Sequence, residues 1–209
     1  MEHFIRLSGR VAAMPAANID TDVIMPKAFL KGIDRSGLAQ GLFHDLRFDG
    51  TGMQRPTFIL NRPDMADTRF LLVGPNFGCG SSREHAVWGM LQYGIRGIIG
   101  SSYGAIFADN AVNNGLLLLS LPSPEIAALT AELNDGAGDM TVDLDAQRIE
   151  MGAYAAGFDI DPAVRRALML GLDRIGETLT HADRIRSFEQ AYLAARPWLM
   201  TGRRDESVS

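Results

Sequence analysis

The sequence predicts an α/β fold with a mixed sheet, and three patterns support this prediction. Between Arg69 and Leu119, short apolar runs alternate with segments of helical spacing, which is typical of right-handed crossover units on a parallel sheet. Met140–Asp145 and Ala153–Ile160 alternate between apolar and polar residues, with Gln147–Glu150 between them, and this favours an antiparallel portion. Ala182–Ala195 has the spacing of a last amphipathic helix.

The chain before this region predicts one strand, a polar loop and a short helix. Phe4–Ala13 alternates loosely and is interpreted as the first strand. In the loop Asn18–Asp22, the carboxylates of Asp20 and Asp22 suit a turn and a helix cap, because Asp bonds readily to nearby backbone N–H groups. Pro26–Lys31 predicts one or two helical turns.

The remaining elements are expected from turn residues, helix caps and apolar runs. In chain order they are a turn at Gly50–Gly52, strands at Thr57–Leu60 and Arg69–Val73, a helix at Ala86–Tyr93, a strand at Gly97–Gly100, a helix at Ala105–Asn114, a strand at Leu116–Leu119, and helices over Ser123–Leu133 and Asp161–Gly171.

Length, charge and cysteine content restrict the classes of protein to which the chain can belong. Its 209 residues predict one domain over residues 1–200 with a helical C-terminal extension, followed by a disordered tail at 201–209. The net charge of -5 argues against nucleic-acid binding, which depends on concentrated Lys and Arg. No apolar run reaches the roughly 18 residues of a membrane span, and residues 1–6 lack a signal-peptide pattern, so we expect a cytoplasmic protein with no membrane partner. The single Cys79 excludes an internal disulfide and an iron–sulfur cluster held by this chain alone.

The segment Gly74–His85 has the composition of an anion-binding turn. It follows the predicted strand Arg69–Val73 and precedes the predicted helix Ala86–Tyr93. Its glycines let the backbone approach a ligand closely, and the start of a helix carries partial positive charge. A strand-to-helix turn of this kind favours a carboxylate or phosphate ligand.

Two interpretations of Ser81 stay open on the residues alone. Ser81 and Glu84 have the S-x-x-E spacing of a capping box, in which both side chains satisfy N–H groups of a first helical turn. A cap does not account for Ser82 and Arg83, which add a hydroxyl and a cation suited to a carboxylate or phosphate. The two roles are compatible, because N–H bonds accepted by a serine oxygen also stabilise its alkoxide.

Three segments resemble a known superfamily. Asn76–His85 resembles the signature of the swivelling domain of the aconitase superfamily. Asn18–Pro26 and Gly171–Leu179 are similar to segments of one family within it, the small subunits of bacterial 3-isopropylmalate dehydratases. The segments stand in the expected order and span the chain from about Phe4 to about Trp198. The resemblance implies a three-layer β/β/α aconitase-like swivelling domain with a mixed sheet and C-terminal helices.

The activity implied by this resemblance is an isomerising hydro-lyase reaction of leucine biosynthesis. It interconverts 2-isopropylmalate and 3-isopropylmalate through the dehydrated intermediate 2-isopropylmaleate. The family's 4Fe–4S cluster is expected in a separate large subunit and no cofactor or metal in this chain, so the implied assembly is a heterodimer acting on a small dicarboxylate hydroxyacid. A related dehydratase acting on methylmalate (citramalate) or a homoaconitate-type substrate is the alternative.

The resemblance also implies roles for four residues of the two loops. Ser81 matches the catalytic serine of the superfamily, which acts as a base in its alkoxide form. Arg83 and Ser82 are expected to bind a substrate carboxylate, and Asp22 matches an active-site carboxylate near the motif arginine. For Arg83, a surface salt bridge with Asp22 or Glu84 is the competing interpretation.

Substrate selectivity is implied to lie in the loop between Phe29 and Arg35. Lys31 and Arg35 are its cations, although a solvated charge is the more common role for each. Phe29 and Leu30 could line an apolar pocket for a branched substrate, and helix packing is the competing use.

Other interpretations of the glycine segment compete with these. A dinucleotide-binding turn needs a third glycine where Arg83 stands, a P-loop needs a lysine before the serine, and a hydrolase elbow needs G-x-S-x-G. Cys79 and His85 could form a thiol nucleophile pair, but no orienting third residue is evident, and a structural role suits His85 better. A non-catalytic binding protein for an anionic metabolite stays open, because the glycine turn alone allows it.

Overall fold

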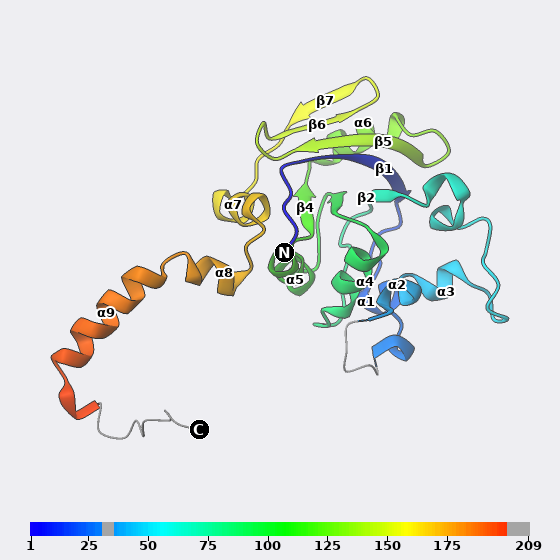
Figure 1. The fold of residues 1–209 in the computed structure, drawn as a ribbon. Helices are drawn as coiled ribbons and strands as arrows, with labels where there is room; N and C mark the ends of the chain where they lie inside the picture. Colours follow the sequence, from blue (N-terminus) through cyan, green and yellow to red (C-terminus); the bar gives the residue numbers. More distant parts are fainter. Residues whose placement is uncertain (31–35, 200–209) are drawn as a thin grey trace. The chain divides into compact units, whose positions relative to one another are not determined.

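The computed structural model describes residues 1–30 and 36–199 and divides the chain into two compact units, Met1–Asp173 and Arg174–Ser209 (Figure 1). The first unit contains the sheet, whereas the described residues of the second form helices. Both loops that the sequence singles out therefore lie in the first unit.

One mixed sheet organises the first unit. Its strands are β1 (Arg6–Met14), β2 (Thr68–Val73), β3 (Gly97–Gly100), β4 (Leu117–Ser120), β5 (Ala137–Asp143), β6 (Arg148–Met151) and β7 (Tyr154–Gly157). They form a 7-stranded sheet in the order β4-β3-β2-β1-β5-β6-β7. The neighbours from β4 to β1 pair in parallel, and those from β1 to β7 pair antiparallel. The predicted α/β fold with a mixed sheet is confirmed.

Two helices connect the parallel strands. α4 (His85–Tyr93) joins β2 to β3, and α5 (Ala105–Asn114) joins β3 to β4, so each connection is a β-α-β crossover. Each helix ends at a glycine with left-handed backbone, Gly94 and Gly115, whose N–H bonds to carbonyls of the last turn. Because β1 and β2 are parallel neighbours, the loops that follow them leave from the same edge of the sheet.

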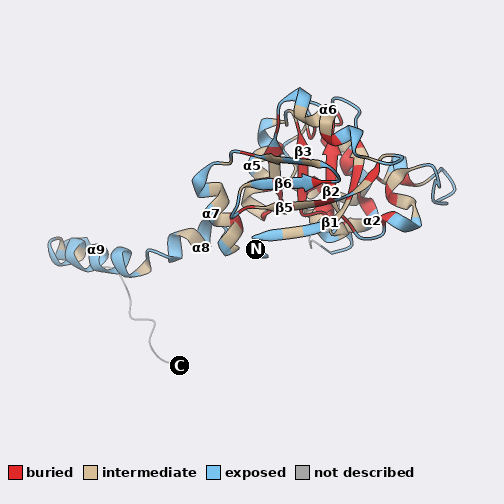
Figure 2. Cartoon of the chain, turned by 90° about the horizontal axis from the view of Figure 1, so that it is seen from above, coloured by how far each residue is buried: buried red, intermediate tan, exposed pale blue. Residues whose placement is uncertain are grey.

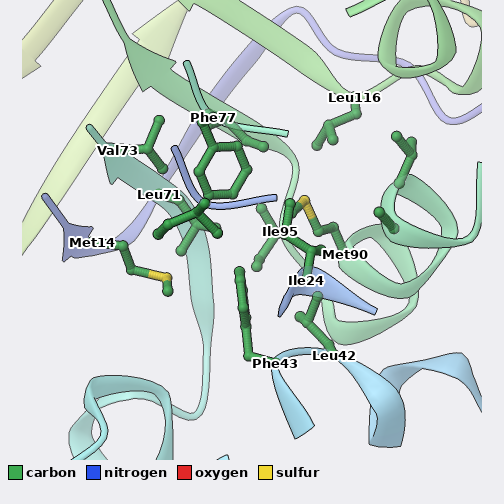
Figure 3. Packing of buried hydrophobic residues seen from close by; sticks show 14 of the residues in the cluster. Met14, Ile24, Leu42, Phe43, Leu71, Val73, Phe77, Met90, Ile95 and Leu116 are labelled. Atoms are coloured by element: carbon green, nitrogen blue, oxygen red, sulfur yellow. The ribbon is translucent and has the colours of Figure 1, made fainter. Parts of the chain in front are cut away.

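Alternate residues of the central strands bury both faces of the sheet. On β2, Leu71 and Val73 pack into one apolar cluster, while Phe70 and Leu72 pack into another. The first cluster also contains side chains of α4 and α5 together with Phe43, as Figure 3 shows in part. The second contains residues of β5 and β6, and partly buried side chains of β7 pack against it. Burial on both faces explains why β2 is almost continuously apolar, and Figure 2 shows the buried residues concentrated in these strands.

Shorter helices complete the first unit. They are α1 (Thr21–Ile24), the 3-10 helix η1 (Lys27–Leu30), α2 (Leu38–Gly41), α3 (His44–Arg47), the 3-10 helices η2 (Ile59–Asn61) and η3 (Pro63–Met65), α6 (Ser123–Ala131) and α7 (Pro162–Leu170). The carboxylate of Asp20 caps α1 by accepting from the N–H of Val23 at 2.8 Å. The cap expected for Asp20 is therefore confirmed.

The strand predicted at Thr57–Leu60 is wrong. Ile59 begins a 3-10 helix instead, and the amide of Asn61 donates to the carbonyls of Arg47 and Arg55 at 2.6 and 2.9 Å. These side-chain bonds satisfy backbone carbonyls that a sheet neighbour would otherwise have to satisfy. The apolar side chains that suggested a strand instead pack a turn against the first apolar cluster.

The segment Gln147–Glu150, which lies between the two alternating segments, overlaps a strand of its own, because residues 148–151 form β6 between β5 and β7. Ile149 is buried, whereas Arg148 and Glu150 are exposed and form an ion pair at 2.9 Å. Period-two alternation is thus present but spans only one strand of four residues. The charged residues at its exposed positions conceal it in the sequence.

The second unit contains α8 (Arg174–Leu179), α9 (Ala182–Ala194) and the 3-10 helix η4 (Pro197–Leu199). α9 confirms the predicted last helix. None of the described residues of this unit is buried, and Ile175, Phe188 and Trp198 are 71%, 68% and 66% exposed.

Over the residues that the structure describes, no helix is long and apolar enough to cross a membrane. The tail predicted at 201–209 lies outside the described residues.

Candidate active site

The two polar loops meet beyond the carboxyl ends of β1 and β2. The N–H of Gly78 donates to the carbonyl of Ile19 at 2.8 Å. The N–H of Thr21 donates to the carbonyl of Cys79 at 2.8 Å. Together these backbone bonds fix the loop that follows β1, which contains Asp20–Asp22, beside the loop that follows β2, Gly74–His85, here called the glycine loop.

Two glycines allow this close approach. A Cβ on Gly74 would lie 2.4 Å from the carbonyl oxygens of both Pro15 and Ala16, so a side chain there would push the loops apart. Gly78 has φ +73°, and a Cβ there would lie 2.3 Å from Cγ of Phe107. Only glycine satisfies both conditions at little cost. Gly74 is therefore required for packing between the two loops, and Gly78 for packing of the glycine loop against α5, whatever ligand the loops bind.

Ser81 lies where side chains of both loops converge. Nε of Arg83 donates to Ser81 Oγ at 2.8 Å, and Oγ1 of Thr21 lies 2.9 Å from the same oxygen. The backbone N–H of Ser81 donates to Thr21 Oγ1 at 3.0 Å. Ser81 as a residue is partly exposed. A cationic donor fixed beside a hydroxyl oxygen is an arrangement that stabilises negative charge on that oxygen.

Arg83 also binds the carboxylate of Asp22. Its Nη2 pairs with Asp22 Oδ1, and the two side chains are 28% and 44% exposed. The other oxygen of Asp22 lies 3.6 Å from Nζ of Lys27. The salt bridge considered for Arg83 therefore forms with Asp22 and not with Glu84, and it coexists with the bond to Ser81. A guanidinium has five N–H donors, so Arg83 keeps donors for a further carboxylate.

A network of amide side chains holds the next residues against α5. Asn110 Nδ2 donates to the carbonyl of Ser82 at 3.3 Å, and Asn114 Nδ2 donates to Glu84 Oε1 at 2.9 Å. Nε1 of Trp88 donates to Asn114 Oδ1 at 2.9 Å. Ser82 is exposed, and the described contacts engage its backbone carbonyl. The backbone at Ser82 is thus held by a side chain of α5, and the exposed Ser82 side chain is available to a ligand.

The predicted capping box does not form. α4 begins at His85 with Glu84 as its N-cap residue, and no side-chain cap bond is present there. Ser81 precedes the helix instead of heading it, because Thr21 and Arg83 engage its hydroxyl. The charge of a helix terminus falls off within one turn. Ser81 lies before the N-cap residue of α4, and the described hydrogen-bond partners of its oxygen are Arg83 and Thr21.

The described contacts of His85 are structural. Its ring lies 4.8 Å from that of Trp88 between centroids, at an interplanar angle of 53°. Its Nδ1 is buried without a hydrogen-bond partner within residues 1–30 and 36–199. Neither feature involves the thiol of Cys79. The described contacts of His85 therefore do not support a Cys–His nucleophile pair.

The structure supports the packing interpretation of the selectivity loop. Phe29 and Leu30 are partly buried against the first apolar cluster, and the Phe29 ring lies 4.9 Å from the ring of His44. Lys31 and Arg35, the two cations of the loop, lie outside the described residues.

Thr21 is the residue that sequence reasoning missed. It is 3% exposed and makes two contacts with Ser81, yet it stands between two aspartates that attract attention first. The available signal was topological. A hydroxyl that follows one parallel strand lies near a serine that follows its neighbour, because the carboxyl ends of parallel strands share an edge.

A metal site needs several donor side chains in one place. Within the part of the chain that the structure describes, no three His, Cys, Asp or Glu side chains come together as a group that could hold a metal ion.

Comparison with known families matches both units. The family model for the aconitase C-terminal domain matches residues 1–124. The model for the C-terminal domain of 3-isopropylmalate dehydratase small subunits matches residues 175–201.

Similar proteins cover nearly the whole chain. The 3-isopropylmalate dehydratase small subunit 1 of Mannheimia succiniciproducens is 49% identical over 200 residues, covering 95% of this chain and 99% of that protein. The small subunit 2 of Salmonella typhimurium is 51% identical over 201 residues, covering 95% and 96%. Among solved structures, 3-isopropylmalate dehydratase from Methanocaldococcus jannaschii matches with a TM-score of 0.65 and 25% identity, covering 88% of this chain and 99% of that one.

Proposed function

This chain belongs to the family of 3-isopropylmalate dehydratase small subunits, and on that basis we propose that its two loops supply the proton-abstracting half of the active site. The enzyme is a hydro-lyase of leucine biosynthesis that interconverts 2-isopropylmalate and 3-isopropylmalate. The names of the relatives favour this substrate over methylmalate and homoaconitate-type alternatives. The cytoplasmic location stays a prediction.

The chemistry presents two difficulties. Hydroxide is a poor leaving group, which calls for a Lewis acid, and a proton beside a carboxylate is weakly acidic, which calls for a positioned base. We propose that this chain meets the second need. The single observation that carries the proposal is the hydrogen bond from Nε of Arg83 to Ser81 Oγ, at 2.8 Å, on a partly exposed residue.

In the proposed step, Ser81 first releases its own proton to solvent and acts as an alkoxide. Its oxygen takes the proton from the substrate carbon, the C–H electron pair forms the carbon–carbon double bond, and hydroxide leaves from the neighbouring carbon. Addition of water in the opposite orientation reverses these changes and gives the isomer. A serine hydroxyl is too weak an acid without help, so Arg83 must stabilise the anion throughout.

The substrate carboxylate is the proposed ligand of the remaining donors. Arg83 can present N–H groups that Ser81 and Asp22 do not use, and the exposed Ser82 hydroxyl can add another hydrogen bond. Asp22 holds the guanidinium in place through its ion pair. An arginine fixed at two positions loses little further freedom when it binds a carboxylate.

A large subunit is the proposed partner, because the relatives are named small subunits. We propose that the 4Fe–4S cluster belongs to it and supplies Lewis acidity to the leaving hydroxide. This chain does not fit such a cluster, since Cys79 is its one cysteine and iron–sulfur clusters are held by several thiolates. Its own residues bind, orient and move a proton.

The variant Ser81→Ala tests the base. In complex with the large subunit, we expect turnover of isopropylmalate to fall by at least about 10²-fold. The free energy of unfolding of the free chain, measured in urea, should decrease by only about 1 kcal/mol, since one partly exposed hydrogen-bonding group is removed.

Ser8→Ala is the matched control, because Ser8 Oγ also pairs with a threonine hydroxyl, Thr141 Oγ1, at 2.7 Å but lies near the amino end of β1, whereas the site lies beyond its carboxyl end. Its turnover should equal that of the wild type. Normal turnover by Ser81→Ala would remove Ser81 from the mechanism. An inactive wild-type complex that still binds the substrate would instead favour a non-catalytic anion-binding role.

A further inference from the structure

Thr21 has an unusual position for a small polar residue. It is 3% exposed, and its hydroxyl lies within hydrogen-bond distance of both the backbone nitrogen and the side-chain oxygen of Ser81, at 3.0 and 2.9 Å. Its backbone is fixed as well, because its N–H donates to the carbonyl of Cys79 at 2.8 Å. The Thr21 oxygen is therefore held rigidly against the candidate base.

The direction of the hydrogen bond between the two hydroxyls follows from counting protons. Thr21 Oγ1 accepts the N–H of Ser81, and its single proton then needs an acceptor, because a buried hydroxyl is rarely left unpaired. As the first residue of α1, Thr21 has no preceding helical turn whose carbonyl could accept that proton. The described partner that remains is Ser81 Oγ.

We propose that Thr21 is a positioning residue that donates its hydroxyl proton to Ser81 Oγ and, with Arg83, fixes and stabilises that oxygen as an alkoxide. This inference rests on the proposed function. Ser81 Oγ then accepts two hydrogen bonds, from Thr21 Oγ1 and from Arg83 Nε, and both persist when it ionises. Its own proton then points away from both donors, because each of them occupies one acceptor position of the oxygen.

The second consequence concerns geometry. Thr21 contacts the backbone and the side chain of the same residue, so it restricts rotation of the Ser81 side chain about its Cα–Cβ bond. Arg83 contacts only the side-chain oxygen of Ser81, so its bond does not tie that oxygen to the Ser81 backbone as Thr21 does. A base that stays in one rotamer keeps the alignment that proton transfer needs.

The variant Thr21→Val tests this role, because it keeps the branched shape and removes the hydroxyl. In the assembled complex we expect kcat to fall by about 10- to 100-fold, with KM changed less than about threefold, because one donor to a developing anion is lost. The pH at which kcat reaches half its plateau should rise by about one unit, which corresponds to tenfold weaker stabilisation of the anion. Thr21→Ser keeps the hydroxyl and should restore most of the activity and the wild-type pH profile.

Thr141→Val is the matched control, since it removes the partner of another serine–threonine hydroxyl pair, 2.7 Å apart, outside the site. It should leave kcat and the pH profile unchanged. A Thr21→Val complex with the wild-type kcat and pH profile would overturn the proposal while leaving Ser81 as the base. If Ser81→Ala stays active, the proposed function fails first, and that result is independent of Thr21.

Folding is the remaining concern, because Thr21 is buried. Thr21→Ala repeats the test with a smaller side chain if Thr21→Val does not assemble with the large subunit. Failure of both to assemble, with normal assembly of Thr21→Ser, would assign the hydroxyl to the fold alone and overturn the role proposed here. The same conclusion would follow if both variants lost activity without any shift in the pH profile.

Discussion

Arg83 connects the two loops through a single guanidinium. Its Nε donates to Ser81 Oγ at 2.8 Å while its Nη2 binds the carboxylate of Asp22. A guanidinium is planar and presents its donors in a rigid fork, so these two bonds also fix the direction of the remaining donors. A lysine ammonium is a point charge and cannot satisfy both partners from one position.

We expect Arg83→Lys to lower kcat/KM of the assembled enzyme by at least about 10²-fold, because it removes a fixed donor from the reacting oxygen. The free energy of unfolding should change by about 1 kcal/mol or less, since partly exposed ion pairs contribute little. Steady-state kinetics of the complex and urea unfolding of the free chain measure the two effects.

Arg148→Lys provides the comparison, because Arg148 pairs with Glu150 at 2.9 Å on an exposed strand face. Both its kinetics and its stability should stay close to those of the wild type. Equal kinetics for the two lysine variants would mean that charge alone, without the fork, suffices at position 83.

Sequence reasoning reached part of this site. The resemblance placed Asp22 near Arg83, and the ion pair between them agrees with that placement. The capping box considered for Ser81 does not form, and Thr21 was missed, for a common reason. The contacts of Ser81 depend on where it lies relative to Thr21, in the loop that follows the neighbouring strand β1. The sequence motif of each loop does not contain the register of the two strands.

The glycine loop as an element depends on conformations that other residues avoid. Gly78→Ala should destabilise the chain by roughly 2 kcal/mol or more, because φ is +73° and the new Cβ would meet Phe107 at 2.3 Å. Activity should fall as well, since the Gly78 N–H holds the loop to Ile19.

Gly50→Ala is the matched substitution, because a Cβ there has nothing within 4 Å. Its effect on unfolding in urea should be within about 0.5 kcal/mol. If both substitutions cost the same, the conformation of the glycine loop would not be what requires glycine at position 78.

The contact between β7 and α6 gives a prediction for alkaline pH. The Tyr154 hydroxyl donates to the Glu125 carboxylate, and burial together with that carboxylate raises the pKa of Tyr154 to about 12. In the unfolded chain a tyrosine has a pKa of about 10, so between these values the unfolded state binds fewer protons than the folded state. The contribution of Tyr154 to stability is therefore complete below about pH 10 and is lost as the pH rises through about 12.

Between about pH 9 and about pH 11, the unfolding free energy of the wild type should decrease more than that of Tyr154→Phe. Both proteins retain Tyr93 and Tyr103, whose pKa values burial also raises, so these groups cancel in the comparison. Denaturant unfolding at the two pH values measures the difference, and parallel decreases would show that Tyr154 does not titrate with unfolding.

At the level of the elements, the crossover region was predictable because each unit is local. An apolar run, a helix and the glycine that ends it follow one another from β2 to α5. The strand predicted at Thr57–Leu60 was wrong because the turn at Ile59–Asn61 is fixed by side-chain bonds between Asn61 and both Arg47 and Arg55, which the composition of the segment does not reveal. β6 is a short strand that pairs with β5 and β7, its neighbours along the chain.

The two units of the chain differ in how much of their surface they bury. The first builds a sheet buried on both faces and carries the candidate site at one edge. The second has no buried residue among those described, although it contains apolar side chains such as Ile175 and Phe188. Helical periodicity predicted α9 well, but periodicity indicates only that a face is apolar and not what covers it.

The division of chemistry between two chains gives the last prediction. In the proposed mechanism this chain supplies a base and hydrogen-bond donors for a substrate carboxylate. The departure of hydroxide needs a Lewis acid, and the one cysteine of this chain cannot hold an iron–sulfur cluster. We therefore expect the purified chain to give no measurable dehydration of isopropylmalate, followed by the ultraviolet absorbance of the unsaturated product. Adding the large subunit should produce turnover that saturates at one chain of each kind, whereas Ser81→Ala should saturate at the same ratio without turnover. Turnover by this chain alone would mean that its own residues stabilise the leaving hydroxide, and the proposed division of roles would be wrong.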